Sequence, residues 1–489
     1  MVRLDATAIA NGSLPIPFPS YDRTRATTGI VHIGVGAFHR AHQAWYHDRL
    51  LGEHGALDWA ICGIGVMPGD ARMRDALSVQ DGLYTLVARN GDGTVDARVI
   101  GALTDYRYSP DQTETTIEKL ADPTTRIVSL TITEGGYNID DLTRTFHADD
   151  PGVVGDLVEG AIPRTVFGIV VEALRRRRER KIPPFTIMSC DNLQGNGDIS
   201  RVAFAAFAHL RDPALGEWVM NEVSFPNSMV DRITPATTDA DRTDVATRFG
   251  IDDLVPVVCE PFAQWVLEDA FSYGRPPYEL VGVQLVDDVA PYELMKLRLL
   301  NAGHQALCYL AALHGHVSVA DAIADPPYRR FVLDFMRREA APTLSPVPGI
   351  DIDAYIETLI QRFSNPYVAD TVARLATDGS DRIPKFVLPI LRRQLESGGE
   401  IRRTSAVVAA WARYAEGVDD NGRAIDVVDR AQPALSERAR RQRTDSRAFV
   451  GHAELFGSLA TDETFLHAYD AALELLRERG ARATADALA

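Results

Sequence analysis

The amino-acid sequence predicts an α/β protein of two domains, the first built on a mostly parallel sheet and the second predominantly α-helical. Three observations predict this fold class. The chain has 489 residues, which is more than one average domain contains. Apolar runs of strand length alternate with helical stretches in the first part. Beyond about residue 288 strand signals nearly vanish, so we place the domains at residues 1–288 and 289–489.

The first strand and its neighbours set the pattern of the N-terminal domain. Residues 29–36 form an apolar strand that ends in a glycine turn, residues 37–51 follow as a helix, and residues 59–66 form a second strand. Further strands are expected at 83–88, 98–100, 126–133 and 185–189, with helices at 115–120 and 164–180. Strands that alternate with helices favour a parallel sheet covered on both faces.

The C-terminal domain is expected to contain helices almost alone. Helical periodicity covers residues 292–313, 330–339, 353–363, 369–376 and 405–416, and also the stretches near 434–441 and 463–479.

Charge and cysteine usage exclude several classes of function. The net charge is 51 − 68 = −17, which argues against binding to nucleic acid or to anionic membranes. The apolar runs are too short to span a bilayer, and the N-terminus lacks the apolar core of a signal peptide, so we expect a cytoplasmic protein. The four cysteines form no CxxC pair, which favours buried free thiols over a zinc site or disulfides.

Lysine is rare in this chain and therefore informative. Only Lys119, Lys181, Lys296 and Lys385 occur among 51 basic residues. Arginine stays protonated, so a position that must release and regain a proton keeps lysine. The surroundings of Lys119 and Lys181 indicate surface positions, and Lys385 is interpreted as a structural ion pair.

The glycine turn predicts a dinucleotide site. A strand, Gly34-Val35-Gly36 and then a helix let a pyrophosphate approach backbone N–H groups, as in a Rossmann-type domain. The third glycine of GxGxxG is replaced by His39. Arg40 is interpreted as a phosphate contact, whereas His39 and His42 lack a third ligand, so no metal is expected. The predicted cofactor residues of this turn are Ile33, Gly34, Val35, Gly36, Ala37, Phe38, His39 and Arg40.

The acid after the second strand indicates which cofactor is used. NAD enzymes place a carboxylate there to bind the adenosine ribose. The first acid beyond Val66 is Asp70, and no arginine lies between them to receive a 2′-phosphate. NAD is therefore favoured over NADP.

Lys296, Asn301 and His304 lie close together in a segment with helical periodicity. At roughly 100° per residue, His304 lies about 80° and Asn301 about 140° from Lys296, so the three side chains share one broad face. A lysine whose pKa is lowered by burial can accept the proton of an alcohol, and carboxamides can stabilise the developing oxyanion without a metal. Asn192, at the end of the strand 185–189, is a second candidate amide.

Several motifs resemble one family over nearly the whole chain. They are VSFPNSMVDRITP (223–235), IGVGAFHRAHQA (33–44), SLTITEGGY (129–137), SCDNL (189–193), VVCEPFAQWVLED (257–269) and the helix 296–304. Together they resemble the polyol-specific long-chain dehydrogenase family, also called the mannitol dehydrogenase family. The resemblance implies metal-independent, NAD-dependent oxidation of a polyol, with D-mannitol to D-fructose as the first expectation.

The resemblance also implies individual roles. Lys296 matches the general acid/base, Asn192 and Asn301 the oxyanion hole, His304 a substrate-positioning residue, and Glu293 a residue that passes the proton to solvent. Asp231 and Arg374 match residues that hold the polyol hydroxyls, and Thr133 and Glu134 match the cofactor site. Arg382 stands where related sequences have lysine, which puts its role in doubt. Gly69 stands where related enzymes carry a second acid before Asp70, so some NADP use is a hypothesis.

Other functions stay open at the level of sequence. The same fold could serve a D-arabinitol or sorbitol dehydrogenase, or a hexuronate reductase that interconverts fructuronate and mannonate. A non-catalytic NAD-binding sensor has no use for a proton acceptor, and a zinc-dependent alcohol dehydrogenase lacks a cysteine ligand set. We expect a small polyol or ketose as the partner of a monomer or weak oligomer.

Overall fold

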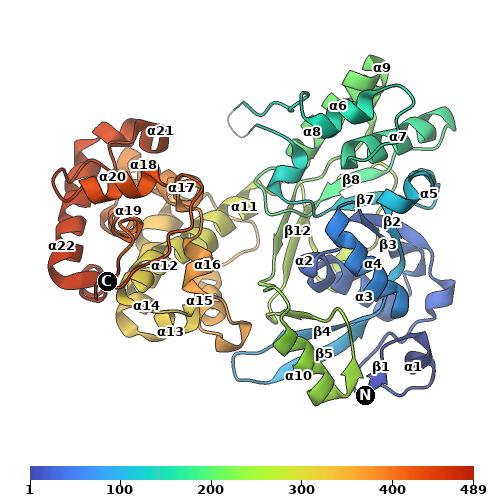
Figure 1. Ribbon diagram of the computed structural model, residues 1–489, viewed down its shortest axis with the longest axis horizontal. Helices are drawn as coiled ribbons and strands as arrows, with labels where there is room; N and C mark the ends of the chain where they lie inside the picture. The colour runs from blue at the N-terminus through green and yellow to red at the C-terminus, as the bar shows by residue number, and fades with distance from the viewer. Residues whose placement is uncertain (141–142) are drawn as a thin grey trace. The chain divides into compact units, whose positions relative to one another are not determined.

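The computed structural model describes residues 1–140 and 143–489, which divide into two units (Figure 1). Unit 1 comprises Met1–Asn90 and Thr94–Ala290, and unit 2 comprises Gly91–Gly93 and Pro291–Ala489. Each unit has its own arrangement of secondary structure and is described separately.

A five-stranded parallel sheet forms the centre of unit 1. The strand order is β6-β3-β2-β7-β8, and every pair of neighbours is parallel. The strands are β2 (Thr28–Ile33), β3 (Ala60–Gly65), β6 (Leu103–Tyr108), β7 (Ile127–Leu130) and β8 (Thr186–Ser189). All residues of β2, β3, β7 and β8 are buried, as expected for parallel strands covered on both faces. The prediction of a mostly parallel sheet is confirmed.

Two separate apolar layers cover the sheet. Consecutive residues such as Ile30 and Val31 of β2 belong to different layers, because side chains of a strand alternate between its faces. One layer contains α5 (Ser109–Ala121), α7 (Val166–Glu179) and α8 (Asn196–Arg211), and the other contains α3 (Gln43–His54). The remaining helices of unit 1 are α1 (Ala6–Ala10), α2 (Ala37–Ala41), α4 (Ala71–Val79), α6 (Pro151–Leu157), α9 (Pro213–Glu222) and α10 (Asp239–Phe249).

Three small sheets complete unit 1. Strand β4 (Tyr84–Arg89) pairs with β5 (Val95–Ile100) and β11 (Val257–Cys259). Strand β12 (Gln264–Glu268) pairs with β9 (Ser228–Asp231) and β13 (Gln284–Val286). The short strands β1 (Val2–Arg3) and β10 (Ile251–Asp252) form the third sheet.

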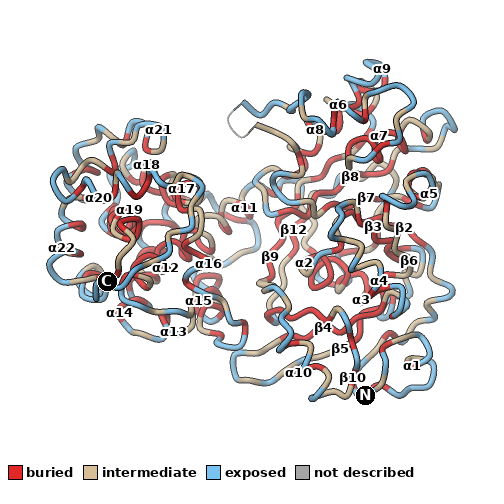
Figure 2. The backbone as a smooth tube through the Cα atoms, viewed as in Figure 1, coloured by how far each residue is buried: buried red, intermediate tan, exposed pale blue. Residues whose placement is uncertain are grey.

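Unit 2 packs its helices around α12 (Ala302–His314), most of whose residues are buried (Figure 2). Helices α14, α16, α19 and α22 contact it. The predicted helical character of this half of the chain is confirmed. Its other helices are α11 (Ala290–Lys296), α13 (Val319–Ala324), α14 (Pro326–Asp334), α15 (Ile352–Phe363), α16 (Val372–Ala376), α17 (Gly379–Arg382), α18 (Leu388–Ser397), α19 (Arg402–Ala415), α20 (Ala434–Arg441), α21 (Ala453–Phe456) and α22 (Glu463–Leu488).

Three segments of unit 2 are π-helical. They are Leu297–Asn301, Phe335–Ala340 and Ile383–Val387, and the first of them packs against the other two. Such segments are rare and frequently mark functional sites.

Two further expectations concern membranes and cysteines. Among the residues that the structure describes, no helix has both the length and the apolar character needed to cross a membrane. All four cysteines are buried and free, as the sequence predicted.

Candidate active site

The glycine turn after β2 leaves room for a ligand at one glycine and none at the other. Gly34 has φ +95°, and a Cβ atom there would lie 2.1 Å from the carbonyl oxygen of Thr131. Gly36 is the N-cap of α2, and a Cβ atom there would meet nothing nearer than 3.9 Å. The first turn of α2 has no side-chain cap. This open, uncapped backbone fits the pyrophosphate of a dinucleotide.

A buried polar network supports the turn from beneath. The His32 ring lies 2.8 Å from Ser129 Oγ through Nδ1 and 3.0 Å from Thr131 Oγ1 through Nε2, and Thr131 Oγ1 donates to Gly34 O over 2.6 Å. The ring of His39 stacks on His32 with centroids 3.4 Å apart. Burial lowers the pKa of His32 to about 3, so its ring is neutral at physiological pH. The His39 side chain belongs to this network as well, because its Nδ1 atom lies 3.1 Å from Gln43 Oε1.

Arg40 does not have the role that the sequence predicted. Its guanidinium is buried, donates to the carbonyl of Val255 and lies over the ring of Tyr84, 5.2 Å from the centroid. The Tyr84 hydroxyl in turn donates to the Arg40 carbonyl over 2.6 Å. The interpretation of its side chain as a phosphate contact is wrong, because the guanidinium contacts Tyr84 of β4 and the carbonyl of Val255 and so packs α2 on these two segments. His42 points elsewhere as well, with Nε2 2.9 Å from the carbonyl of Gln264.

Asp70 lies where the sequence placed it, just after β3. Its Oδ2 accepts hydrogen bonds from the N–H groups of Val66 (2.9 Å) and Met67 (2.8 Å). These two bonds hold the carboxylate at the carboxyl end of β3, the position at which Rossmann-type domains recognise the adenosine ribose.

Asp191 is a residue whose role the sequence did not reveal. Its carboxylate accepts hydrogen bonds from the N–H groups of Ile132 (3.0 Å) and Thr133 (2.9 Å) and from the Tyr137 hydroxyl (2.7 Å). Thr133 has φ +64°, a strained value for a β-branched residue. Burial raises the pKa of Asp191, although these donors oppose the shift. Asp191 thus links the ends of β7 and β8 and fixes the segment that contains Thr133 and Glu134. Its place directly before Asn192 is the signal that could have identified it.

Asn192 and Asp231 both lie near the carboxyl ends of strands of unit 1. Asn192 is exposed three residues beyond the end of β8, and Asp231 is the buried last residue of β9. The end of β8 is joined to the start of β9, because Ser228 Oγ donates to the carbonyl of Ser189 over 2.6 Å. Asn196 Nδ2 donates to the carbonyl of Ser228 over 2.8 Å.

The segment from Lys296 to His304 is not a continuous α-helix. Lys296 ends α11, Leu297–Asn301 is π-helical, and His304 lies in the first turn of α12. The expected angular positions of Asn301 and His304 therefore do not apply, because they assumed α-helical geometry throughout. The side chains of Glu293, Lys296 and His304 are nevertheless buried. The Oδ1 atom of Asn301 is also buried and has no hydrogen-bond partner among the described residues.

Close packing fixes this part of unit 2. The His304 ring stacks on Phe363 with centroids 4.3 Å apart. A Cβ atom at Gly303 would lie 2.3 Å from Met336 Cε, so the glycine allows α12 to approach the π-helical segment Phe335–Ala340. The backbone around His304 therefore has little freedom to shift.

The two predicted arginines lie beside α12. Arg374 is paired through two contacts with Asp370, at 2.6 and 2.7 Å. Burial opposes ionisation of Asp370, but Arg374 holds the pKa of that carboxyl below its usual range. Arg382 Nη1 donates to the carbonyl of Leu375 over 2.9 Å, and Gln305 of α12 donates to the same oxygen over 3.1 Å.

The remaining lysine prediction is confirmed. Lys385 Nζ lies 3.2 Å from Asp381 in an i,i+4 ion pair.

The fold and these groups define a class: a Rossmann-type α/β enzyme with a dinucleotide turn in one unit and, in the other, a buried lysine, a buried imidazole and an amide on the helical stretch 296–304. The family model of the mannitol dehydrogenase Rossmann domain matches residues 28–280, and that of the mannitol dehydrogenase C-terminal domain matches residues 288–477. The chain belongs to the mannitol dehydrogenase family and is an NAD-dependent oxidoreductase acting on CH–OH groups.

Relatives are similar over almost their full length. A mannitol 2-dehydrogenase of Aspergillus fumigatus is 46% identical over 484 residues, which are 98% of this chain and 96% of the relative. A mannitol dehydrogenase of Saccharomyces cerevisiae is 44% identical over 98% of this chain and 95% of its own length.

Two solved structures are similar to the chain as well. The Pseudomonas fluorescens mannitol 2-dehydrogenase in ternary complex with NAD and D-mannitol is 43% identical with a TM-score of 0.87, covering 100% of this chain and 99% of that one. A D-sorbitol dehydrogenase in substrate-free form is 37% identical with a TM-score of 0.93, covering 99% and 100%.

Proposed function

We propose that this protein catalyses the reversible, NAD-dependent oxidation of D-mannitol to D-fructose. The observation that carries this proposal is that Lys296, Asn301 and His304 lie on one helical stretch, with Lys296 and His304 buried. The chain is also 43% identical to an enzyme solved with NAD and D-mannitol. An amine, an amide and an imidazole provide the functions that alcohol oxidation requires.

Proton removal is assigned to Lys296. As a secondary alcohol is oxidised, its hydroxyl proton moves to the Lys296 amine. The glycine turn and Asp70 would hold NAD, which would supply the acceptor for the hydride that leaves the carbon. The amides of Asn192 and Asn301 donate hydrogen bonds to the reacting oxygen as it gains negative charge. His304 orients that oxygen, and its ring is held in place by Phe363. Glu293, one turn before Lys296, passes the proton on to solvent.

Substrate and cofactor contacts follow the predicted residues, with one change. Asp231, Arg374 and Arg382 bind the other polyol hydroxyls. The cofactor contacts are the backbone of residues 33–40, the carboxylate of Asp70 and the segment with Thr133 and Glu134. For Arg40 and His39 only the backbone is included, since both side chains are buried elsewhere.

The test is a screen of NADH formation, measured by absorbance, with D-mannitol, D-arabinitol, D-sorbitol and D-mannonate. We expect the highest kcat/KM with mannitol. Sorbitol is the second candidate, because a D-sorbitol dehydrogenase matches with a TM-score of 0.93. Faster turnover of mannonate would instead support a hexuronate reductase. No turnover of any of these, with NADH still bound, would support a sensor.

Two further measurements complete the proposal. Repeating the assay with NADP tests whether Gly69, in place of a second acid, permits use of the phosphorylated cofactor; a rate equal to background would remove that hypothesis. Turnover should survive exhaustive chelation, because Lys296 rather than a metal accepts the proton. We also propose that the protein is cytoplasmic. We propose further that it is a monomer or weak oligomer, which light scattering across a concentration series would test.

A further inference from the structure

Far along α12 from His304, the end of this helix approaches the start of α14. His314 is the last residue of α12, Gly315 turns the chain with φ +100°, and His316 follows. Asp325 stands at the N-cap position of α14. One ligand atom from each of His314, His316 and Asp325 lies within 4.8 Å of the other two. All of these residues belong to unit 2.

The polar atoms of this cluster do not satisfy one another. His316 Nε2 is buried and has no hydrogen-bond partner among the described residues. It faces Asp325 Oδ2 at 3.8 Å, which is too long for a hydrogen bond. The hydroxyl of Tyr328, whose ring meets that of His316 edge-on with centroids 5.4 Å apart, is likewise buried without a hydrogen-bond partner in the described part of the chain. A buried nitrogen left unbonded is costly unless something else binds it.

The Asp325 carboxylate is turned toward the histidines and not toward its own helix. An aspartate at an N-cap normally accepts a hydrogen bond from the first turn of the helix. Asp325 makes no such bond to α14 and instead faces His316 and Arg482. The two-point pair with Arg482 holds the carboxylate in this orientation, which also presents its Oδ2 atom to His316.

We propose that His314, His316 and Asp325 bind one divalent transition-metal ion of the Zn²⁺ type. Zinc bonds to histidine nitrogen and carboxylate oxygen measure about 2.0–2.2 Å, so two ligand atoms of one ion lie at most about 4.4 Å apart. The 3.8 Å separation of His316 Nε2 and Asp325 Oδ2 falls within that limit. His314 is exposed and can turn its ring to complete the set.

The ligand types determine which ions this cluster selects. Two imidazoles and one carboxylate suit zinc and neighbouring transition metals, whereas Mg²⁺ and Ca²⁺ prefer oxygen ligands alone.

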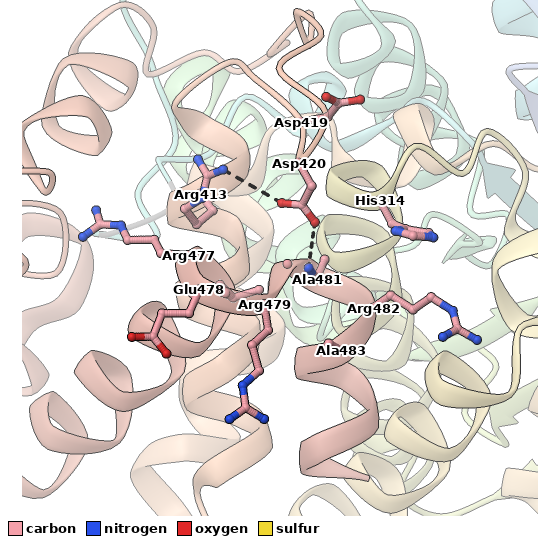
Figure 3. Close-up of a pocket in the computed structure, with 12 residues that line it drawn as sticks. His314, Arg413, Asp419, Asp420, Arg477, Glu478, Arg479, Ala481, Arg482 and Ala483 are labelled. Atoms are coloured by element: carbon pink, nitrogen blue, oxygen red, sulfur yellow. Dashed lines mark hydrogen bonds and ion pairs between the residues drawn. The ribbon is translucent and has the colours of Figure 1, made fainter.

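Arg482 is the group that opposes binding. Its guanidinium pairs with both carboxylate oxygens of Asp325, at 2.8 and 3.0 Å, and its charge repels a cation. It is half exposed and lines an open pocket of about 560 Å³ together with His314 (Figure 3). The guanidinium can therefore withdraw toward solvent while Asp325 keeps lone pairs for the metal. Arg482 limits the affinity and does not occupy the place of a ligand.

A metal ion here would connect the end of α12 with the start of α14 and stabilise unit 2. The ion takes no part in the proposed oxidation, since Lys296 accepts the proton there. Metal binding and polyol turnover can therefore fail independently of each other.

The experiment uses the full chain, treated with chelator, dialysed and then exposed to ZnCl₂. Bound zinc per chain is measured by elemental analysis after equilibrium dialysis, and thermal unfolding is followed with and without zinc. We expect the wild-type protein to bind one zinc ion that is lost in His316→Ala, and zinc to raise Tm only where it binds. MgCl₂ at the same concentration should leave Tm unchanged.

The matched control is His467→Ala, which removes an exposed histidine of α22 outside the cluster and should keep the zinc ion. His314→Ala removes an exposed ligand and should weaken zinc binding as well. It tests the site even if the His316→Ala protein fails to fold. Arg482→Gln should bind zinc more tightly than the wild type, because the competing charge is gone. Equal zinc binding by wild type, His314→Ala and His316→Ala would overturn the proposal.

Discussion

The glycine turn of unit 1, residues 34–36, and the helical stretch of unit 2 from Lys296 to His304 present their functional groups in opposite ways. At the turn, the backbone faces outward and the side chains of His32, His39 and Arg40 are turned into buried contacts. At the helix, the side chains of Lys296 and His304 carry the chemistry, and the backbone departs from α-helical geometry. The turn thus acts as a backbone site, which needs glycine wherever a side chain would block access to the ligand. The stretch 296–304 acts as a side-chain site, in which the path of the helical backbone sets the direction of each functional group.

The largest expected effect concerns the side-chain site. Lys296→Ala should lower kcat with mannitol by about 10²- to 10⁴-fold, the range for loss of a general base. NADH affinity, measured by fluorescence titration, should remain near the wild-type value. Lys181→Ala, at an exposed lysine of unit 1, is the control and should keep full turnover. An active Lys296→Ala enzyme would contradict the assignment.

The two glycines of the backbone site are expected to have different roles, Gly34 in stability and Gly36 in cofactor binding. Gly34→Ala should lower the free energy of unfolding by about 3 kcal/mol or more, because φ +95° and the Thr131 carbonyl 2.1 Å away both exclude a Cβ atom. Gly36→Ala should leave Tm nearly unchanged but weaken NADH binding about tenfold or more, since the added methyl group would enter the space meant for the pyrophosphate. Chemical denaturation and cofactor titration of both variants measure these effects. Equal stability of the two variants would remove the distinction.

The buried histidines of unit 1 predict a dependence of stability on pH. Burial lowers the pKa of His47 to about 4 and that of His32 to about 3. Between about pH 6.5 and 4 the unfolded chain binds protons that the folded protein does not, so stability falls as the pH falls, by about 1.4 kcal/mol per pH unit per histidine. Above about pH 7 these groups contribute no slope.

Denaturant unfolding at several pH values checks this slope. In His47→Gln the acid-side slope should decrease by one proton, whereas His54→Gln, at an exposed histidine, should leave it unchanged. Equal acid-side slopes in the wild type and in His47→Gln would show that the His47 ring takes up its proton as readily in the folded protein as in the unfolded chain.

The smallest expected effect concerns support of a substrate contact. Asp370→Asn removes the charge that holds the Arg374 guanidinium, so KM for mannitol should rise about threefold to tenfold while kcat changes little. Steady-state kinetics measures both constants. Asp381→Asn, which removes the partner of Lys385 instead, is the matched control. A fall in kcat without a change in KM would assign Asp370 to the chemical step.

The sequence predicted the parallel sheet, the helical second half and the buried cysteines because each rests on a local pattern. Strand β6 was not predicted, since only its first residue, Leu103, is fully buried and no apolar run marks it. The π-helical segment was not predicted either, because Leu297–Asn301 contains no residue that distinguishes it from an α-helix. In both cases the local conformation depends on packing against neighbouring elements, which a local sequence pattern does not show.

The errors and omissions at the site have the same cause. Arg40 was misassigned because its partners, Tyr84 and Val255, lie 44 and 215 residues away. Asp191 was passed over because its importance depends on donors near residue 132. The cluster of His314, His316 and Asp325 also joins two elements that local spacing does not connect.

The four buried cysteines have a practical consequence for experiments on this enzyme. Burial raises the pKa of every one of them, so little reactive thiolate forms near neutral pH. We therefore expect slow reaction with maleimides and tolerance of mild oxidants without added reductant. A single cysteine introduced at an exposed position would then be the dominant labelling site. A fluorophore or spin label can thus be attached at the introduced cysteine without first replacing the four natural cysteines.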